Sequence, residues 1–315
     1  MDAVGPIWVL LSLAFAAPAL GAAAPASGPG LTPDELAAMR NHGAEPLALV
    51  DLVRYRQGSD RERFRAHLEH LGGTIEWAGR VDQQFIGRGD AEWDDVVISE
   101  YSSGDALLAR LAATEPHEVD EILVRRRTHP AQPWPWYGRS VAAVAFAVLN
   151  LVGGGPAPLP LSAALRELEK TPRQPGAGAD PLAPTAAQMR AFVTGDPASR
   201  VVMFNFLAYP PHLVEPSSAT GAQSPPREEE YDRYGNAAAV MIGRIGGRLR
   251  WIGWPLAAAG GDAAESWDYV TVVEYPSRAA FLGMVTSPAY DAITPHRAAG
   301  LERTEIFACT SWPEF

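Results

Sequence analysis

The sequence predicts an α+β protein built from two copies of one split βαβ unit. Residues 72–77 read GGTIEW and residues 246–251 read GGRLRW. Each block is followed by Trp-Asp and then Glu-Tyr, so that Trp267 and Glu274 lie 174 positions after Trp93 and Glu100. Within each copy the pattern runs strand, helix, strand, strand, helix, strand, which is the arrangement of ferredoxin-like domains. One such sheet leaves a face bare, and a second copy in the same chain can cover it.

Composition sets the broad class. A chain of 315 residues with 47% hydrophobic and 20% charged residues is long enough for about two domains. The net charge of −11 argues against a nucleic-acid partner, which requires clustered Lys and Arg. The basic run 125–127 is interpreted as the exposed end of a helix. The single cysteine, Cys309, excludes an intrachain disulfide and a cysteine metal site, and its apolar neighbours indicate a buried side chain.

The first 30 residues differ from the rest of the chain. Residues 7–20 are almost wholly apolar and lead into small residues, the layout of a secretory signal peptide with cleavage near Gly21 or Ala22. Asp2 and the lack of Lys or Arg before Arg40 depart from that layout, which leaves an uncleaved membrane anchor as the alternative. We therefore expect an exported protein, periplasmic or extracellular, or one anchored through this segment.

Each half opens with a helix and an apolar strand. Thr32 with Glu35, and Thr185 with Gln188, have the spacing of a capping box. The strands that follow are predicted at 47–53 and 201–207. About 20 extra residues then precede the first long helix of the second half, and the segment 210–226, rich in Pro, Ser, Ala and Gly, predicts a surface loop.

The next elements also match between the halves. A helix ends at each double glycine. A strand with Trp77 or Trp251 follows, then strands at 95–101 and 269–275, and a second helix begins near Gly104 or Ser277.

The halves differ at the last strand. After Arg127 the first half contains three prolines, which predicts an edge strand, an irregular segment or a displaced strand. Residues 141–152 are the displaced candidate and suit a buried helix equally well. The predicted organisation is a signal peptide or anchor at 1–30, a degenerate first unit at 31–137, a linker with short helices, one at 161–170, within 138–181, and a second unit at 182–315.

The second half resembles a known family. Val201-Val202-Met203-Phe204-Asn205, the double glycine at 246, residues 275–281, and 287–290 with Pro295-His296-Arg297 are similar to the domains of unknown function numbered 1330. That family belongs to the dimeric α/β-barrel superfamily. The resemblance covers about 184–315, and less closely 31–137. It implies a barrel made by two ferredoxin-like units, as a monomeric pseudo-dimer or a homodimer, and it implies no particular reaction.

Several residues are candidates for a site. Asn205 and Asp51 occupy equivalent places in apolar strands, where each either faces a ligand or bonds a neighbouring segment. His296 has no counterpart in the first half and could move a proton, although a surface or hydrogen-bonded histidine is the alternative. Glu100 and Glu274 recur in both halves, which favours a structural place at the barrel mouth.

Aromatic residues supply the other candidates. Tyr234, Trp254 and Tyr290 have no aromatic match in the first half and are therefore candidates for a pocket. Trp251 and Trp267 are matched by Trp77 and Trp93, which favours a core role, with Trp251 kept as a further pocket residue.

Three functions follow as hypotheses. In the first, the second half binds or converts a small apolar or aromatic molecule without a metal or cofactor, as do the cofactor-independent oxygenases and isomerases of the superfamily that this chain resembles. Asn205 and Tyr234 would orient a polar group and His296 would move a proton, while Trp254 and Tyr290 enclose the ligand. The second is haem binding or degradation, using Asn205, Trp251 and His296. The third is a noncatalytic binding or structural module.

Overall fold

The computed structural model describes residues 31–58, 60–87, 92–113, 117–159, 182–210, 227–256 and 266–315, together with 163 and 166. The apolar segment 1–30, most of the inserted segment 210–226, and the linker helix expected at 161–170, apart from two residues, lie outside the described residues.

The first half contains the predicted order of elements, with one further short helix before the last strand. Its elements are α1 (Pro33–His42), β1 (Leu47–Tyr55), α2 (Asp60–His70), β2 (Thr74–Ile86), β3 (Asp95–Tyr101), α3 (Gly104–Ala113), α4 (His117–Ile122) and β4 (Leu123–Pro133). A further helix, α5 (Trp136–Val152), follows β4.

The second half repeats the strand order. Its elements are α7 (Ala186–Val193), β5 (Val201–Ala208), α8 (Arg227–Arg244), β6 (Arg248–Pro255), β7 (Tyr269–Tyr275), α9 (Arg278–Val285), α10 (Pro288–Gly300) and β8 (Arg303–Ser311).

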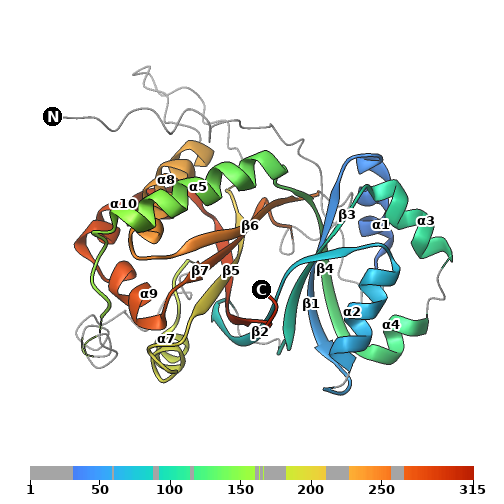
Figure 1. Ribbon diagram of the computed structural model, residues 1–315, viewed down its shortest axis with the longest axis horizontal. Coiled ribbons are helices and arrows are strands. Elements are labelled where there is room, and N and C mark those ends of the chain that lie inside the picture. Colours follow the sequence, from blue (N-terminus) through green and yellow to red (C-terminus); the bar gives the residue numbers. More distant parts are fainter. Residues whose placement is uncertain are drawn as a thin grey trace.

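The eight strands close into one barrel in the order β1-β3-β2-β8-β5-β7-β6-β4. Each half contributes a four-stranded antiparallel sheet with the ferredoxin-like order, and the two sheets join at β2–β8 and at β4–β6. Helices α1 to α4 lie outside the first-half strands, whereas α5 and α7 to α10 surround the second-half strands (Figure 1). The predicted α+β fold of two ferredoxin-like sheets forming one barrel is therefore confirmed.

The barrel interior is filled by side chains from both halves. Because side chains alternate along a strand, every second residue points inward. The inward residues form one apolar cluster that includes Trp77, Trp251, Phe204, Phe206 and Phe307. Cys309 belongs to the same cluster and is fully buried, as expected.

The predicted helix starts are also present. The Thr32 hydroxyl accepts from the Glu35 amide while the Glu35 carboxylate accepts from the Thr32 amide, and Thr185 and Gln188 repeat both bonds. The glycines that end the long helices, Gly72 and Gly246, adopt φ of 80° and 89°, a conformation that side chains disfavour.

The expectation of an irregular last strand in the first half was wrong. β4 pairs with β1 from Leu123 to Ala131. In a strand, the N–H and C=O of one residue face the same neighbour. The carbonyl of Pro130 accepts from Leu256 on the β6 side, so its missing N–H takes no bond from β1. Pro133 lies beyond the last residue paired with β1. Pro130 and Pro133 therefore cost no hydrogen bond between β4 and β1.

The interpretation of residues 125–127 as the exposed end of a helix was also wrong, because they belong to β4. Arg126 points away from the barrel interior and donates to both carboxylate oxygens of Asp51, at 2.8 and 3.0 Å. Thr128 donates to the same carboxylate at 2.6 Å. Asp51 is fully buried, and Arg126, which lies diagonally across from it on β4, supplies the neutralising charge.

Residues 141–152 form part of α5 and not a displaced strand. The helix is only partly buried: Ala142 and Phe146 pack inward, whereas Val144 and Leu151 are exposed. Among the described residues, no helix is long and apolar enough to cross a bilayer.

Candidate functional site

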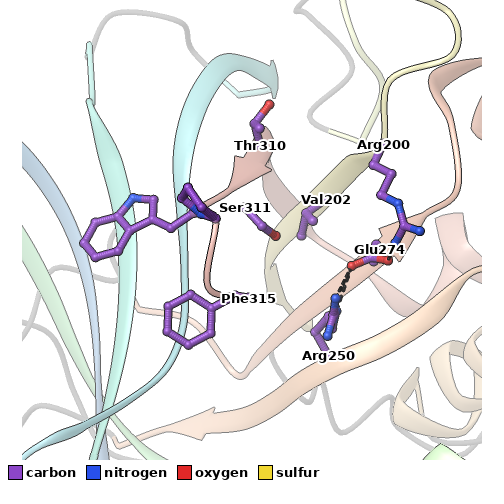
Figure 2. Close-up of a pocket in the computed structure, with 9 residues that line it drawn as sticks. Arg200, Val202, Arg250, Glu274, Thr310, Ser311 and Phe315 are labelled. Carbon is purple, nitrogen blue, oxygen red and sulfur yellow. Dashed lines mark hydrogen bonds and ion pairs between the residues drawn. The ribbon is translucent and has the colours of Figure 1, made fainter.

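A cavity of about 230 Å³ opens at one end of the barrel in the second half. Residues from β5, β6, β7 and β8 and the segment after β8 surround it (Figure 2). They are Arg200, Val202, Arg250, Glu274, Thr310, Ser311, Trp312, Pro313 and Phe315.

The polar wall of the cavity is built around Glu274. This inward residue of β7 is 4% exposed, and an unpaired carboxylate at such a position would be costly. Arg250 binds it through Nε and Nη2 at 2.8 and 2.5 Å, Arg200 through Nη1 at 2.9 Å, and Arg248 through Nε at 3.2 Å. Three guanidinium groups thus face one carboxylate, which leaves two positive charges in excess.

The three arginines differ in exposure. Arg200 and Arg248 have side chains 66% and 46% exposed, so water and salt screen their charges. The Arg250 side chain is 27% exposed, so solvent screens its charge least of the three.

The opposite wall is apolar with two hydroxyls. Val202, Trp312 and Phe315 provide the apolar surface. The Ser311 oxygen accepts from Trp77 Nε1 at 3.1 Å, and the Thr310 hydroxyl donates to Asp82 at 2.8 Å. The site therefore offers an excess of positive charge beside apolar surface.

The equivalent end of the first half is arranged differently. Glu100 corresponds to Glu274, but it accepts from Trp251 Nε1 at 2.8 Å and from Arg139 at 2.5 Å. Arg139 also binds Glu76 at 3.1 Å. The two glutamates lie at the barrel end, as expected, but the first-half carboxylate is held by an arginine from α5.

The predicted catalytic residues do not line this cavity. Asn205 faces away from the barrel interior, and its Nδ2 donates to the Met203 carbonyl at 2.9 Å and to the Thr271 carbonyl and hydroxyl at 3.1 Å. His296 lies on α10 with its side chain 39% exposed and its Nδ1 2.5 Å from Glu230 of α8.

Two predicted residues do meet in the layer between sheet and helices. The hydroxyls of Tyr234 and Tyr290 lie 2.8 Å apart. Burial, followed by the neighbouring Tyr290, raises the pKa of Tyr234 well above its ordinary value. Tyr231 packs beside Tyr234 with ring centroids 5.6 Å apart, so this layer contains three neighbouring tyrosines.

The two tryptophans predicted for the pocket lie in different parts of the protein. Trp254 is 37% exposed and packs on Tyr269, with ring centroids 5.8 Å apart. Trp251 is buried in the barrel interior, where it bonds Glu100. Asn205, Trp251 and His296, proposed together for haem, thus lie on opposite sides of the sheet and are not brought to one site.

Sequence reasoning missed the cavity residues, because they lie far apart in the sequence and meet only in the folded barrel. One signal was nevertheless present in the sequence. Glu76 of the first half corresponds to Arg250 of the second, a reversal of charge within the repeated block. That reversal marks the second half as the one whose barrel end became positive. The recurrence of Glu274 as Glu100 by itself favours a structural role.

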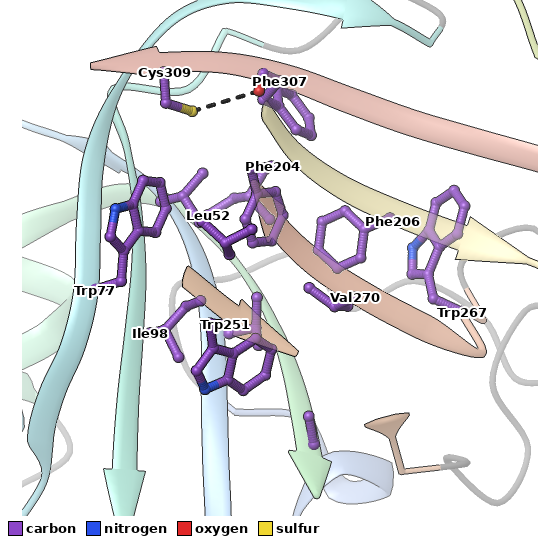
Figure 3. Packing of buried hydrophobic residues seen from close by; sticks show 14 of the residues in the cluster. Leu52, Trp77, Ile98, Phe204, Phe206, Trp251, Trp267, Val270, Phe307 and Cys309 are labelled. Carbon is purple, nitrogen blue, oxygen red and sulfur yellow. Dashed lines mark hydrogen bonds between the residues drawn. The ribbon is translucent and has the colours of Figure 1, made fainter. Parts of the chain in front are cut away.

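A second polar group lies inside the barrel and was also missed. His129 packs edge-on against Phe206, with ring centroids 4.8 Å apart, and Trp267 stacks on the same ring at 5.3 Å (Figure 3 shows Phe206 and Trp267). Arg127 lies over Phe206 and binds Glu305. Among the described residues, the buried His129 Nε2, Arg127 Nε and Trp267 Nε1 have no hydrogen-bond partner. Burial, followed by the charges of Arg127 and Arg303, lowers the pKa of His129 well below its usual value.

Within the described part of the chain, no group of three or more His, Cys, Asp or Glu side chains is placed to hold a metal ion.

Residues 224–309 match the family described as a domain of unknown function, DUF1330. No curated protein matches the sequence. A solved protein of unknown function from Rhodopseudomonas palustris is 28% identical over 40% of this chain and 93% of its own, with a TM-score of 0.34. An anthrone oxidase-like protein is 12% identical over 85% and 93% of the two chains, with a TM-score of 0.39.

A chlorite dismutase variant from Candidatus Nitrospira defluvii is 9% identical over 86% of this chain and 93% of its own, with a TM-score of 0.41. Similarity at these TM-scores says nothing about the chemistry of this chain. The predicted family resemblance is confirmed for residues 224–309.

Proposed function

We propose that the second half binds a small organic anion with an apolar or aromatic body in the cavity at the barrel end. The observation that carries the proposal is the surplus of guanidinium groups around Glu274, beside the apolar side chains of Val202 and Phe315. An anionic group would bind the arginines through charge-assisted hydrogen bonds, while the apolar body would lie on the opposite wall.

The volume supports a small ligand. Pockets for drug-sized molecules measure roughly 300–1,000 Å³, and this cavity of about 230 Å³ is smaller. A single ring with a carboxylate is the size of ligand that we propose. The lining residues include no histidine, cysteine or lysine, so the cavity offers groups that bind and orient a ligand more than groups that transfer a proton.

The test compares matched ligands on purified protein. Benzoate and phenylacetate, at millimolar concentration, should raise the melting temperature because they bind the folded state, whereas benzamide and phenylacetamide should not. Arg250→Gln removes the least exposed arginine and leaves Arg200 and Arg248 on Glu274. A hydrogen bond to a charged group contributes about 1.5–3 kcal/mol, so carboxylate affinity should fall by roughly 10- to 100-fold.

Arg244→Gln is the matched control. Arg244 is exposed at the end of α8 and is not one of the residues that line the cavity or bind Glu274, so its loss should leave carboxylate affinity unchanged. If no carboxylate in the panel raises the melting temperature, or if Arg250→Gln binds as tightly as the wild type, the proposed anion site is wrong.

A second candidate is conversion of a small molecule in the layer between α8 and α10. One observation favours it: the carboxylate of Glu230 lies 2.5 Å from His296 Nδ1, an arrangement that orients an imidazole for proton transfer. Tyr234 and Tyr290 would then bind the polar group of the ligand. His296→Ala should abolish any turnover found for the protein without changing its melting temperature by more than a few degrees; unchanged turnover would remove His296 from the mechanism.

A further inference from the structure

Helix α5 presents an apolar stripe to solvent. The stripe consists of residues at spacings of four and three, with exposed fractions of 51%, 39%, 65%, 49% and 87%: Tyr137, Val141, Val144, Val148 and Leu151. Trp136 and Val152, 77% and 66% exposed, extend it at the two ends. We call these seven residues the α5 stripe. Such a continuous apolar surface is unusual on a chain with 20% charged residues and a net charge of −11.

The opposite side of α5 is firmly docked. Ala142 and Phe146 are buried in the second-half core. Leu149 packs so closely on Gly243 of α8 that an added Cβ at that glycine would lie 2.6 Å from the Leu149 Cβ. Arg139 donates to the Trp134 carbonyl at 2.8 Å, and its ion pairs with Glu76 and Glu100 hold the start of the helix. The stripe is therefore displayed by a rigid helix that runs beside α8 (Figure 1).

The spacing indicates what covers the stripe. Apolar residues that alternate at four and three positions are the a and d positions of a coiled-coil seam. Ala143 and Ala147 lie beside the seam and are small enough to let a second helix approach closely. Arg139, the one charged residue of α5, is already bound to two carboxylates. The α5 helix itself therefore offers no further charged side chain to a partner.

A second copy of this chain meets these requirements, because it carries the same uncharged seam on an equally rigid helix. A membrane surface fits less well, since interfacial helices carry Lys and Arg on their polar side. We propose that α5 mediates a symmetric dimer in which the α5 stripes of two chains pack against each other. The proposal does not depend on the anion site at the barrel end.

The test measures the assembly state of the full chain. A helix of this length is about 25 Å long, so the interface is small, and we expect a dimer with a Kd in the micromolar range. Sedimentation velocity at about 100 μM should show a dimer that dissociates on dilution. Val144→Glu and Leu151→Glu would place carboxylates in the seam and should raise the Kd on the order of 100-fold.

Val124→Glu is the matched control, because Val124 is 53% exposed on β4, outside the stripe, and its substitution should leave the dimer intact. Val144 lies at the middle of α5, where a two-fold axis would bring it beside its own copy. Val144→Cys should therefore form an interchain disulfide on mild oxidation, while the wild type, whose Cys309 is buried, should not.

Three results would overturn the proposal. The first is a wild-type chain that stays monomeric at 100 μM. The second is a dimer that survives both glutamate substitutions. The third is a full chain that dimerises only after residues 1–30 are removed. If that full chain is monomeric, the segment 1–30 covers the α5 stripe; if it binds vesicles through the stripe, a membrane covers it.

Discussion

At the scale of single residues, the barrel interior shows how equivalent positions of the two halves have diverged. His129 on β4 and Phe307 on β8 occupy equivalent inward positions. His129 pairs with Val50 of β1, and Phe307 pairs with Phe204, the equivalent residue of β5. Phe307 is buried in the apolar cluster. His129 brings a titratable ring into the same interior, where its Nε2 has no hydrogen-bond partner within the described part of the chain. Its lowered pKa means that the folded protein holds this ring neutral.

The pH dependence of stability follows from this shift. In the unfolded chain His129 should titrate near pH 6.5, whereas in the folded protein its pKa is lower, so the unfolded state binds more protons as the pH falls below 6.5. This residue should therefore make the free energy of unfolding decrease by up to about 1.4 kcal/mol per pH unit below about pH 6.5. His129→Phe should remove that contribution.

Urea unfolding of the wild type and His129→Phe between pH 7.5 and 5 measures the effect. The free energy of unfolding should fall more steeply with decreasing pH in the wild type than in the variant below pH 6.5. Above pH 6.5 the two free energies should change in parallel. Parallel curves throughout would mean that His129 is protonated as easily in the folded state as in the unfolded chain.

At the scale of elements, α5 and α8 make a close helix contact that depends on one glycine. Both lie over the second-half sheet, although α5 follows the last strand of the first half (Figure 1). Gly243 allows α8 to approach Leu149 of α5, whereas Gly235 on the same helix has nothing within 4 Å of an added Cβ. The two glycines therefore separate the effect of packing from that of helix propensity.

Alanine at each glycine tests this contact. Both substitutions gain roughly 0.5–1 kcal/mol of helix propensity. Only Gly243→Ala also introduces overpacking, which costs about 1–3 kcal/mol. Gly235→Ala should thus stabilise the protein, and Gly243→Ala should be less stable than Gly235→Ala by about 1–3 kcal/mol in chemical denaturation. Equal stabilities would show that α5 and α8 are not in such close contact.

At the scale of the whole molecule, closure of the barrel depends on two unequal seams. β2 and β8 pair from Gly79 opposite Ser311 to Ile86 opposite Ile306. β4 and β6 pair only at the three positions Ala131–Pro255, Gln132–Trp254 and Pro133–Gly253. Prolines on both β4 and β6 remove donors from the shorter seam. The interior cluster contains residues of both halves, so neither half has a complete core alone.

Hydrogen exchange should show this asymmetry. Local opening needs less free energy where fewer hydrogen bonds and contacts must break. The amides of Trp134 and Leu256, which bond across the β4–β6 seam, should exchange faster than those of residues 79–86 in the β2–β8 seam. Thermal unfolding should still be one transition, because the core is shared. Earlier exchange at β2–β8, or two separate transitions, would contradict this account.

Local patterns predicted much of the fold. The capping boxes at Thr32 and Thr185 and the helix ends at Gly72 and Gly246 depend on neighbours a few residues away, so they could be read directly. The prolines after Arg127 misled for the same reason. Their cost depends on which neighbouring strand each one faces, and only the pairing of β4 with β1 and β6 decides that.

Apart from the last strand of the first half, the sequence by itself determined the strands and main helices of each half and their order along the chain, because the periodicity of strands and helices and the glycine ends are local properties. The tertiary structure alone decided the candidate site, since Arg200, Arg250 and Glu274 are separated by 24 to 74 residues and meet through the register of three neighbouring strands. It also decided that Arg126 is buried and that α5 keeps an apolar face exposed. The burial of Arg126 and the meeting of the cavity residues both result from closure of the barrel, to which distant segments of the chain contribute together.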